Sequence, residues 1–333
     1  MITVRLLGGL GNQLFQYALY VAFQEKGIEC NIDDNIAPQY VVRKAMLKEA
    51  FGLDYERYDE KMDEIPLCEY YEAGPENRFA KAHLEYYKYL LLLLADKYWY
   101  SFFRKQRIIV HSYFQDYRIF KSRKVSKRLR NELTFTDERK NKPAFSEWLN
   151  RIKNTPSASL HFRRDDYLQG GNVALYGGIC TEEYYQKAIE IVLSKEKDAI
   201  FYVFSDDKEY IREKYNDERF IIVDDDNLDD LDEFFLMSSC KHHVLANSTF
   251  SWWSAWLDDN PNSIKVAPEK WLNKPTQPHL HMKRMNIVSC GGSCLNKPDI
   301  TDAGCPPPQR SRRRVPYSIV SGGSQSPTDD LMS

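Results

Sequence analysis

The sequence predicts an α/β protein built on parallel sheets, and two observations carry this prediction. Short apolar runs, each the length of a buried strand, alternate with stretches of helical period, most regularly after residue 154. Glycine or polar residues follow most of these runs directly, and open α/β sheets bind ligands at the carboxyl ends of their strands. The chain has 333 residues, of which 43% are hydrophobic and 28% charged. This length suits two globular domains of ~100–200 residues each.

A strand, a glycine turn and a helix open the chain. The apolar residues 2–7 precede the glycine turn, residues 8–11, and helical spacing continues to about residue 26. Glycine permits positive φ and close backbone approach, and a strand–turn–helix of this kind presents backbone N–H groups to an anion. A tight turn without a ligand explains the pattern equally well. Asn12 and Gln13 add two amides at the helix start, where a single N-cap side chain suffices.

A second strand at 29–33 completes a β-α-β unit, and residues 37–150 are predicted to be mostly helical and aromatic, with one strand at 108–114. Six aromatic residues gather in this part of the sequence, at positions 86, 87, 89, 98, 99 and 100. They either pack between helices, which is the simpler explanation, or contact a variable ligand. The apolar burst at 90–95 is far shorter than the ~20 residues of a membrane-spanning helix, so it is predicted to be a buried helix segment.

From residue 154 onward, strand and helix alternate regularly. The predicted strands cover 157–162, 199–204, 220–223, 243–246 and 263–267, the last strand of the chain. The predicted helices cover 182–194, with Thr181 as N-cap, a stretch from 208 to about 215, 231–238 and 252–257. This repeat is typical of a parallel, doubly wound sheet.

We therefore predict three parts: an amino-terminal α/β domain at 1–153, a regular Rossmann-like domain at 154–290 and a disordered tail at 291–333. The tail contains six of the fifteen prolines, five of the fifteen glycines and one aromatic residue, and such a composition does not bury a core.

Composition disfavours several classes of protein. The net charge of −2 and the pI of about 6.4 argue against nucleic-acid binding. Seven scattered cysteines without a Cys-x-x-Cys pair favour a reducing compartment over a zinc site or a disulfide framework. Predicted structure starts at the amino terminus and leaves no room for a signal peptide. We expect a cytoplasmic protein, either free or peripherally bound at the inner membrane.

Four polar groups follow predicted strands, at residues 8–13, 161–166, 205–207 and 247–251. Two Rossmann-like halves facing each other would bring all four to one cleft. The second group contains two adjacent arginines, whose guanidinium forks suit a diphosphate. The alternative is an exposed, salt-bridged turn. The fourth group places hydroxyls and an amide before a helix, where phosphate oxygens bind well; the alternative there is a simple N-cap followed by a buried tryptophan pair.

The motifs themselves are Gly-Gly-Leu-Gly-Asn-Gln-Leu-Phe-Gln-Tyr-Ala at 8–18, His-x-Arg-Arg-x-Asp at 161–166, Phe-Ser-Asp-Asp at 204–207 and Asn-Ser-Thr-Phe-Ser-Trp-Trp at 247–253. In this order they resemble the α-1,2-fucosyltransferases of glycosyltransferase family 11, in the bacterial form. The resemblance spans residues 1 to about 288. The His-x-Arg-Arg-x-Asp motif is shared with α-1,6 and protein O-fucosyltransferases, so it specifies the donor more than the linkage.

The resemblance implies a GT-B-like fold with an acceptor-side domain at 1–153 and a GDP-fucose-binding domain at 154–290. It implies inverting transfer of L-fucose from GDP-β-L-fucose to O2 of a terminal galactoside, in surface-glycan, lipopolysaccharide or O-antigen synthesis. The expected partners are GDP-fucose and a galactose-terminated or lipid-linked glycan acceptor, without nucleic acid. The alternatives are a fucosyltransferase of α-1,6 or α-1,3 linkage, and a catalytically idle GDP-sugar-binding protein.

The resemblance also implies roles for individual residues. Arg164 would stabilise the departing diphosphate, and His161 and Asp166 are the other predicted catalytic residues. Asp33 joins His161 and Asp166 as a candidate base, and the residues do not decide between the three. The predicted donor contacts are Gly9, Gly11, Asn12, Gln13, Arg163, Arg164, Asp206, Asp207, Asn247, Ser248, Thr249 and Ser251. No cofactor and no metal ion are expected, because the acidic run at 224–226 is predicted to be a surface cap before a helix.

Overall fold

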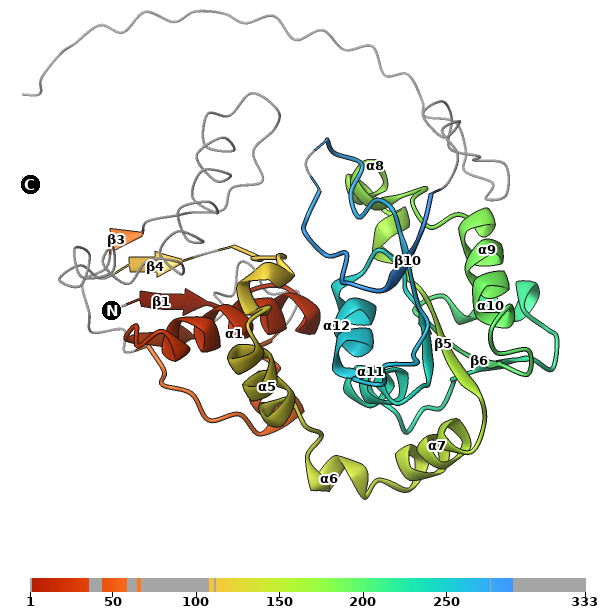
Figure 1. Cartoon of the computed structure of the whole chain (residues 1–333), viewed down its shortest axis with the longest axis horizontal. Coiled ribbons are helices and arrows are strands. Elements are labelled where there is room, and N and C mark those ends of the chain that lie inside the picture. Colours follow the sequence, from red (N-terminus) through yellow and green to blue (C-terminus); the bar gives the residue numbers. More distant parts are fainter. Residues whose placement is uncertain are drawn as a thin grey trace, which may run out of the picture. The chain divides into compact units, whose positions relative to one another are not determined.

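Two parallel β-sheets organise the chain in this computed structural model, which describes residues 2–35, 44–58, 65–66, 108–110, 112–275 and 277–289 (Figure 1). The smaller sheet has the order β2-β1-β4-β3, and the larger sheet has the order β10-β9-β8-β5-β6-β7. All the pairings between these strands are parallel. The predicted α/β class, with parallel sheets in the GT-B manner, is confirmed.

The strands of the smaller sheet are β1 (Ile2–Arg5), β2 (Cys30–Asp33), β3 (Ile65–Pro66) and β4 (Ile108–Val110). Those of the larger sheet are β5 (Ser157–Phe162), β6 (Ile200–Ser205), β7 (Phe220–Ile222), β8 (His242–Val244), β9 (Lys265–Pro268) and β10 (Met285–Val288). The α-helices of the described residues are α1 (Leu10–Glu25), α2 (Leu47–Phe51), α5 (Arg123–Glu132), α6 (Asp137–Lys140), α7 (Pro143–Lys153), α8 (Asn172–Tyr176), α9 (Glu182–Leu193), α10 (Lys208–Lys214), α11 (Asp230–Ser238) and α12 (Thr249–Leu257). Two 3-10 turns, η2 (Tyr117–Phe120) and η3 (Asp166–Leu168), complete them.

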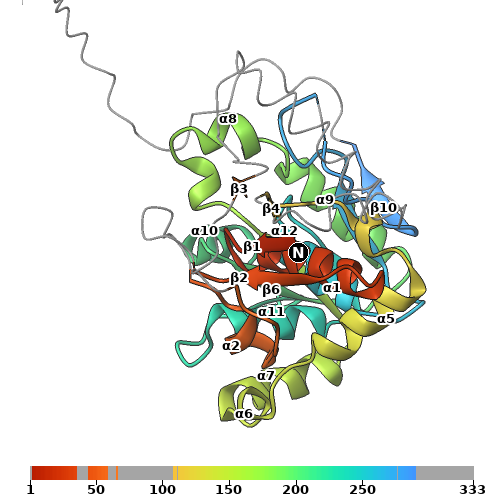
Figure 2. The ribbon, with the colours of Figure 1, turned by 90° about the vertical axis from the view of Figure 1, so that its left-hand side faces the viewer.

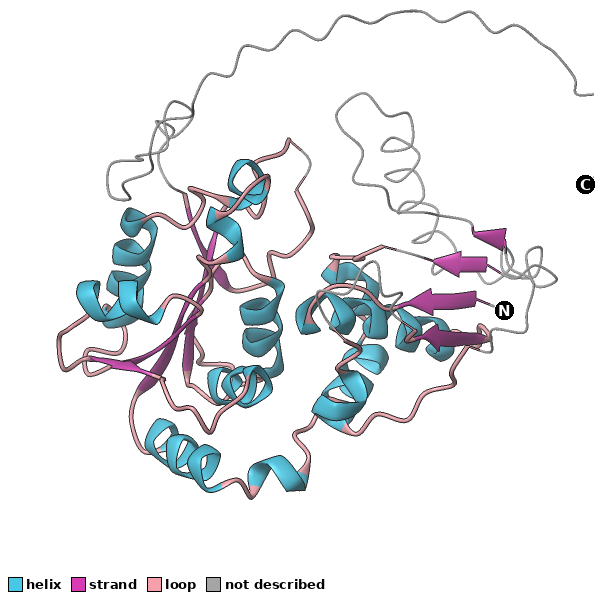
Figure 3. Ribbon diagram, turned by 180° about the vertical axis from the view of Figure 1, so that it is seen from behind, coloured by secondary structure: helices cyan, strands magenta, loops and turns pink. Residues whose placement is uncertain are grey.

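Helices cover both faces of the larger sheet, α9 and α10 on one side and α11 and α12 on the other (Figure 3). Side chains alternate between the faces of a strand, so β6 contributes to two separate cores. Phe201 and Val203 pack with α9, whereas Tyr202 and Phe204 pack with α11 and α12. Every residue of β5 is buried, as expected for the centre of a sheet covered on both faces. The doubly wound sheet predicted from the strand–helix repeat is therefore present.

Helix α1 connects the two sheets through its contact with α12. It is buried over most of its length, as expected for a helix enclosed by other elements, and α5 lies alongside it (Figure 2). The ring of Phe15 in α1 packs against Trp252 and Trp253 of α12, with centroid distances of 5.0 and 5.1 Å. Phe120 stacks on Trp253 at 5.0 Å and also contacts Phe15. The tryptophan pair after the fourth polar group is therefore a core element.

Local sequence signals account for several helix starts. Thr181 caps α9 by accepting a hydrogen bond from the Tyr184 amide, as predicted. Asp229 and Asp232 form a capping box at the start of α11. Pro143 occupies the first turn of α7, where its missing N–H has no cost.

Three predicted boundaries were wrong. Helix α12 begins at Thr249, three residues early, because Ser248 is its N-cap, so Thr249 and Ser251 lie inside the helix. The strand at 108–114 ends at Val110, and Phe114 has a positive φ of 48°. Residues 263–267 are not the last strand, since β10 pairs with β9 beyond them. Ile287 of β10 is 41% exposed at this sheet edge, so the strand lacks the continuous apolar run of a central strand.

Several predictions fall outside the described residues: the aromatic gathering at 86–100, the apolar burst at 90–95 and the tail at 291–333. The domain boundary at 153/154 stays a prediction; it coincides with the turn between α7 and β5. Among the helices that the structure describes, none combines the length and the hydropathy that crossing a bilayer would need.

Candidate active site

The glycine turn positions the start of α1 against the start of α12. Gly8 has a φ of +74°, which favours glycine, and Gly9 is the N-cap of α1. At Gly11 a Cβ would lie 2.5 Å from the carbonyl carbon of Thr249 and 2.7 Å from the Phe250 amide nitrogen. Only glycine allows this approach. The first and fourth polar groups are therefore in direct contact, as predicted.

Asn12 and Gln13 have different surroundings. The Asn12 side-chain oxygen accepts hydrogen bonds from Gln115 Nε2 at 2.9 Å and Thr249 Oγ1 at 3.2 Å, so it connects the two helix starts. Gln13 is fully buried. Its amide nitrogen donates to the carbonyl oxygens of Gly8 and Lys44, and its oxygen accepts from the Met46 amide. Gln13 thus holds the glycine turn in shape, and a nucleotide contact would have to break these bonds.

The fourth polar group is also mostly engaged within the protein. Asn247 is buried and donates to the carbonyl oxygens of Tyr176 and Trp271, both at 3.3 Å. Ser248 caps α12 by accepting from the Phe250 amide. Ser251 is buried, and its hydroxyl donates to backbone carbonyls at the start of its own helix. These side chains shape the helix start, so the predicted ligand contacts of Asn247 and Ser251 receive no support from geometry.

Strand β5 carries the second polar group to the carboxyl edge of the larger sheet. His161 and Phe162 are buried at the end of the strand, and Arg163 and Arg164, hereafter the arginine pair, come directly after it. Because β6 is the parallel neighbour of β5, its own carboxyl end brings Asp206 and Asp207 to the same edge. The second and third polar groups therefore meet, as predicted.

Carboxylates hold each arginine in place. Arg163 contacts Asp166 through Nε at 2.9 Å and Asp206 through Nη1 at 3.0 Å. Arg164 donates from Nε to Asp207 at 2.9 Å and from its backbone amide to Asp206 at 2.9 Å. Both guanidinium groups remain partly exposed. Asp206 and Asp207 thus preorganise the arginines. Contacts between these two carboxylates and a guanine or ribose stay a prediction.

The aromatic ring of Tyr210, which lies beside the arginine pair, was not predicted from the sequence. The Arg164 guanidinium carbon lies 3.4 Å from the centroid of the Tyr210 ring, a cation–π contact. Tyr210 follows the N-cap Asp207 by three residues in α10, so its ring can reach back over the arginine. Only this helical spacing could have pointed to it.

Gln115, which contacts Asn12, was also not predicted as a site residue. It lies directly after the predicted strand at 108–114, and a polar group directly after a strand was the signal used for the four polar groups.

His161 is a buried, neutral histidine. Burial lowers its pKa to about 3, and the positive charge of Arg163 acts in the same direction. Its Nδ1 has no hydrogen-bond partner, and its ring lies 6.0 Å from that of Phe250. This contact connects the second polar group with the fourth, as does the hydrogen bond from the Tyr167 hydroxyl to the Asn247 carbonyl at 3.0 Å. All four polar groups therefore form one contiguous region.

Glu233 is a further carboxylate that the sequence analysis missed. Burial raises its pKa to about 7, although Lys208 lies 3.4 Å away and acts in the opposite direction. The charge of Asp206 adds to the raised pKa, so Glu233 senses the same aspartate that holds the arginine pair. The signal available in the sequence was an acidic residue within the predicted helix at 231–238, whose other residues are mostly apolar.

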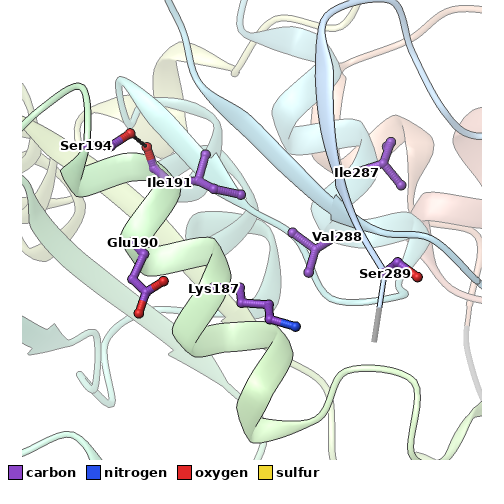
Figure 4. A pocket seen from close by; sticks show the side chains of 7 residues that line it. All are labelled: Lys187, Glu190, Ile191, Ser194, Ile287, Val288 and Ser289. Atoms are coloured by element: carbon purple, nitrogen blue, oxygen red, sulfur yellow. Dashed lines mark hydrogen bonds between the residues drawn. The ribbon is translucent and has the colours of Figure 1, made fainter. Parts of the chain in front are cut away.

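In the part of the chain that the structure describes, neither a cluster of metal ligands nor the surface depression between α9 and β10 adds a residue to this region. Across the described ranges, no group of three or more His, Cys, Asp or Glu side chains is arranged to hold a metal ion. A surface depression of about 440 Å³ lies between α9 and β10, lined by Lys187, Glu190, Ile191, Ser194, Ile287, Val288 and Ser289 (Figure 4). None of these residues belongs to the four polar groups.

Two parallel sheets, with an arginine pair and two helix amino termini at their strand ends, have the arrangement at which α/β proteins bind anionic groups. The Glycosyl transferase family 11 model matches residues 1–288. The chain belongs to glycosyltransferase family 11.

Several known proteins are similar to this chain. The Alpha-1,2-colitosyltransferase of Escherichia coli is 31% identical over 280 residues, which cover 82% of this chain and 93% of that protein. The O-antigen biosynthesis glycosyltransferase WbnK of Escherichia coli is 28% identical, covering 80% of this chain and 93% of that protein. The crystal structure of the fucosyltransferase NodZ from Bradyrhizobium matches with a TM-score of 0.45 and 12% identity, covering 76% of this chain and 92% of that one.

Proposed function

We propose that the protein is an inverting α-1,2-fucosyltransferase that moves L-fucose from GDP-β-L-fucose to O2 of a terminal galactoside during O-antigen or other surface-glycan synthesis. Membership of family 11 and the four motifs support the fucosyl donor. The α-1,2 linkage is supported by the relative named for that linkage, and the glycan context by the relative named for O-antigen biosynthesis.

The fixed arginine pair is the observation that carries the proposal. Departure of GDP builds negative charge on the β-phosphate, and preorganised cations stabilise such charge without reorganising during the reaction. The Arg164 guanidinium group donates from Nε to Asp207 and lies over the ring of Tyr210, and the Arg164 backbone amide donates to Asp206. Its guanidinium group therefore stays in one orientation as the bond breaks. Arg163 supports it or contacts the nucleotide.

The two adjacent helix starts provide a second source of positive potential. Each α-helix carries a partial positive charge at its amino terminus, and α1 and α12 bring theirs together at Gly11 and Thr249. Two like dipole ends in contact repel each other, and an anion bound between them relieves this repulsion. We assign Gly9, Gly11, Asn12, Ser248 and Thr249 to the diphosphate side of the site.

The transfer breaks the bond between fucose C1 and the diphosphate oxygen, and it forms a bond between C1 and the acceptor O2. The acceptor hydroxyl loses a proton, which a base can accept. Of the three candidates, His161 is buried with a pKa of about 3, and Asp33 is buried and paired with Arg5 at 2.6 Å. Asp166 is also paired with an arginine, Arg163, at 2.9 Å, but its side chain is 48% exposed, so we propose Asp166 as the proton acceptor.

The decisive experiment measures transfer from GDP-fucose to lactose with EDTA present. We expect the wild-type protein to remain active, because the arginine pair replaces a metal ion. Arg164→Ala should lower kcat by ~10²–10³-fold, the usual cost of one preorganised donor. The matched control is Arg219→Ala, which removes a guanidinium group that contacts only the Lys197 carbonyl among the described residues.

Two outcomes would refute this proposal. One is an Arg164→Ala variant that stays within tenfold of the wild type. The other is loss of transfer in EDTA that added Mg²⁺ or Mn²⁺ restores. A protein that binds GDP but transfers nothing to any β-galactoside would favour the idle GDP-sugar-binding alternative. A cytoplasmic location, free or peripheral at the inner membrane, stays a prediction that cell fractionation checks.

A second candidate function keeps the linkage and changes the sugar. The relative that transfers colitose is 31% identical over most of this chain, which favours colitose as the alternative donor sugar. Parallel assays with the fucosyl and colitosyl donors, followed by linkage analysis of the product, distinguish the two sugars. The same linkage analysis separates α-1,2 from α-1,6 or α-1,3 transfer.

A further inference from the structure

The segment that follows the arginine pair, residues 167–178, combines exposure with an absence of charge. From Tyr167 to Thr181 the sequence contains no Asp, Glu, Lys, Arg or His, in a chain of which 28% is charged. Residues 168–174 are nevertheless all exposed. Exposed loops of soluble proteins are usually rich in charged residues, so this stretch needs another explanation.

Large apolar side chains project from the same segment. Among the described residues, three large apolar residues are more than one third exposed: Leu168, Val173 and Ile287, with exposed fractions of 51%, 37% and 41%. Two of these three lie within ten residues of Arg164. Exposed apolar groups gathered at one place mark a binding surface more often than scattered ones do.

The segment is fixed at both ends. The Leu168 amide donates to the Arg164 carbonyl at 2.9 Å, and Asn172 Nδ2 donates to the Asp166 carbonyl at 3.1 Å. At the other end, Asn273 donates to the carbonyls of Leu175 and Gly177, both at 2.8 Å. The exposed residues 168–174 therefore begin with a hydrogen bond to the backbone of the arginine pair.

Two stacked tyrosine rings within the segment stabilise its conformation. Tyr167 stacks on Tyr176 with a centroid distance of 4.5 Å and an interplanar angle of 14°. The Tyr167 hydroxyl and the Asn247 side chain connect this pair to the start of α12. A surface held in this way is preorganised for binding. We call residues 167–178 the acceptor platform.

We propose that the acceptor platform binds the neutral sugar that receives the transferred group, with Leu168 and Val173 packing against the apolar C–H face of its ring. This inference rests on the proposed function. The reaction joins one anionic ligand and one neutral ligand, and the arginine pair serves the anion. An uncharged surface adjoining that pair complements the neutral ligand. Gln169 and Asn172 lie between Leu168 and Val173 in the sequence. Their side-chain nitrogens donate to Asp165 and to the Asp166 carbonyl, and their side-chain oxygens can accept from sugar hydroxyls.

The test compares wild type, a Leu168→Ser/Val173→Ser double variant and an Ile287→Ser control, each loaded with GDP. Ile287 is a matched control, because it is equally exposed and lies on β10, outside the four polar groups. Lactose binding is measured by saturation-transfer NMR, and transfer kinetics are measured with GDP-fucose and lactose. GDP affinity is measured by calorimetry.

We expect the double variant to lose the lactose signal and to show a roughly tenfold or larger drop in kcat/KM for lactose, the scale on which small apolar contacts discriminate substrates. Its GDP affinity and its KM for GDP-fucose should stay within twofold of the wild type. The control should match the wild type throughout.

Lactose binding and use by the double variant at the wild-type level would overturn the proposal. So would a wild-type protein that gives no lactose signal. Retained lactose binding with loss of binding to anionic phospholipid vesicles would replace the sugar with a lipid surface. A wild type that binds lactose through the platform but does not use GDP-fucose would leave the platform standing and refute the proposed donor.

Discussion

Replacing Gly11 by alanine tests whether the contact between α1 and α12 is as close as the structure has it. The new Cβ would lie 2.5 Å from Thr249 C and Oγ1 and 2.7 Å from the Phe250 amide nitrogen. Ordinary contacts begin near 3.4 Å, so the overlap is close to 1 Å. The threonine hydroxyl can rotate away, but the two backbone atoms cannot. Helix α12 must therefore retreat from α1.

The expected cost follows from two opposing effects. Overpacking a tight interface costs ~1–3 kcal/mol, and alanine offsets up to ~1 kcal/mol of this through its better helix propensity. We expect the free energy of unfolding to fall by about 1–2 kcal/mol, which lowers the Tm by roughly 2–8 °C for a protein of this size. The retreat of α12 also breaks the 3.2 Å hydrogen bond from Thr249 Oγ1 to the Asn12 side-chain oxygen. Because both residues are assigned to the diphosphate side of the site, transfer from GDP-fucose should fall as well.

Thermal and urea unfolding followed by circular dichroism provide the measurement. Gly171→Ala is the matched control, because Gly171 has a φ of −68° and its new Cβ would meet no atom within 4 Å. Equal stability of the two variants would refute the argument, since it would mean that α1 and α12 do not approach as closely as we describe.

Two further predictions concern buried charge. Arg139 binds Asp229 and the fully buried Asp232, so Arg139→Met should lower the free energy of unfolding by about 3–5 kcal/mol by leaving the buried Asp232 carboxylate with Lys142 as its one cationic partner among the described residues; a loss below 1 kcal/mol in urea would contradict this. His161 stays neutral in the folded protein down to about pH 3, whereas the unfolded chain protonates it near its ordinary pKa of 6.5. The unfolded state thus binds more protons between these pH values, and stability is lost as the pH falls through this window. His161→Phe should flatten the stability–pH profile there, by at most ~1.4 kcal/mol per pH unit, and an unchanged profile would show that His161 is protonated in the fold.

Much of the fold was predictable because it depends on local patterns. The alternation of apolar runs and helical stretches located β5, β6, α9 and α11 to within a residue or two. Hydrogen-bonding side chains next to these runs located caps such as Thr181, which acts within its own turn. The edge strand β10 was missed because an edge strand is half exposed and its pattern resembles that of a loop.

The candidate site divides in the same way. That polar groups would follow the strands, and that the arginine pair would stand at the end of β5, could be inferred from the sequence alone, because parallel strands place their carboxyl ends at one edge. Which partners these groups take was decided by the tertiary structure. Gln13 is buried under the glycine turn, and Asp206 and Asp207 serve the arginines because β6 happens to be the neighbour of β5.

The sequence by itself therefore determined the class of fold, the order of its elements and the chemistry present at the strand ends. Only the tertiary structure decided that Gly11 must be glycine and that Tyr210 covers Arg164. The physical reason is the range of the interactions. Backbone propensity and side-chain period act over a few residues, whereas contacts across roughly 40 to 240 residues depend on strand order and helix packing, which no local pattern specifies.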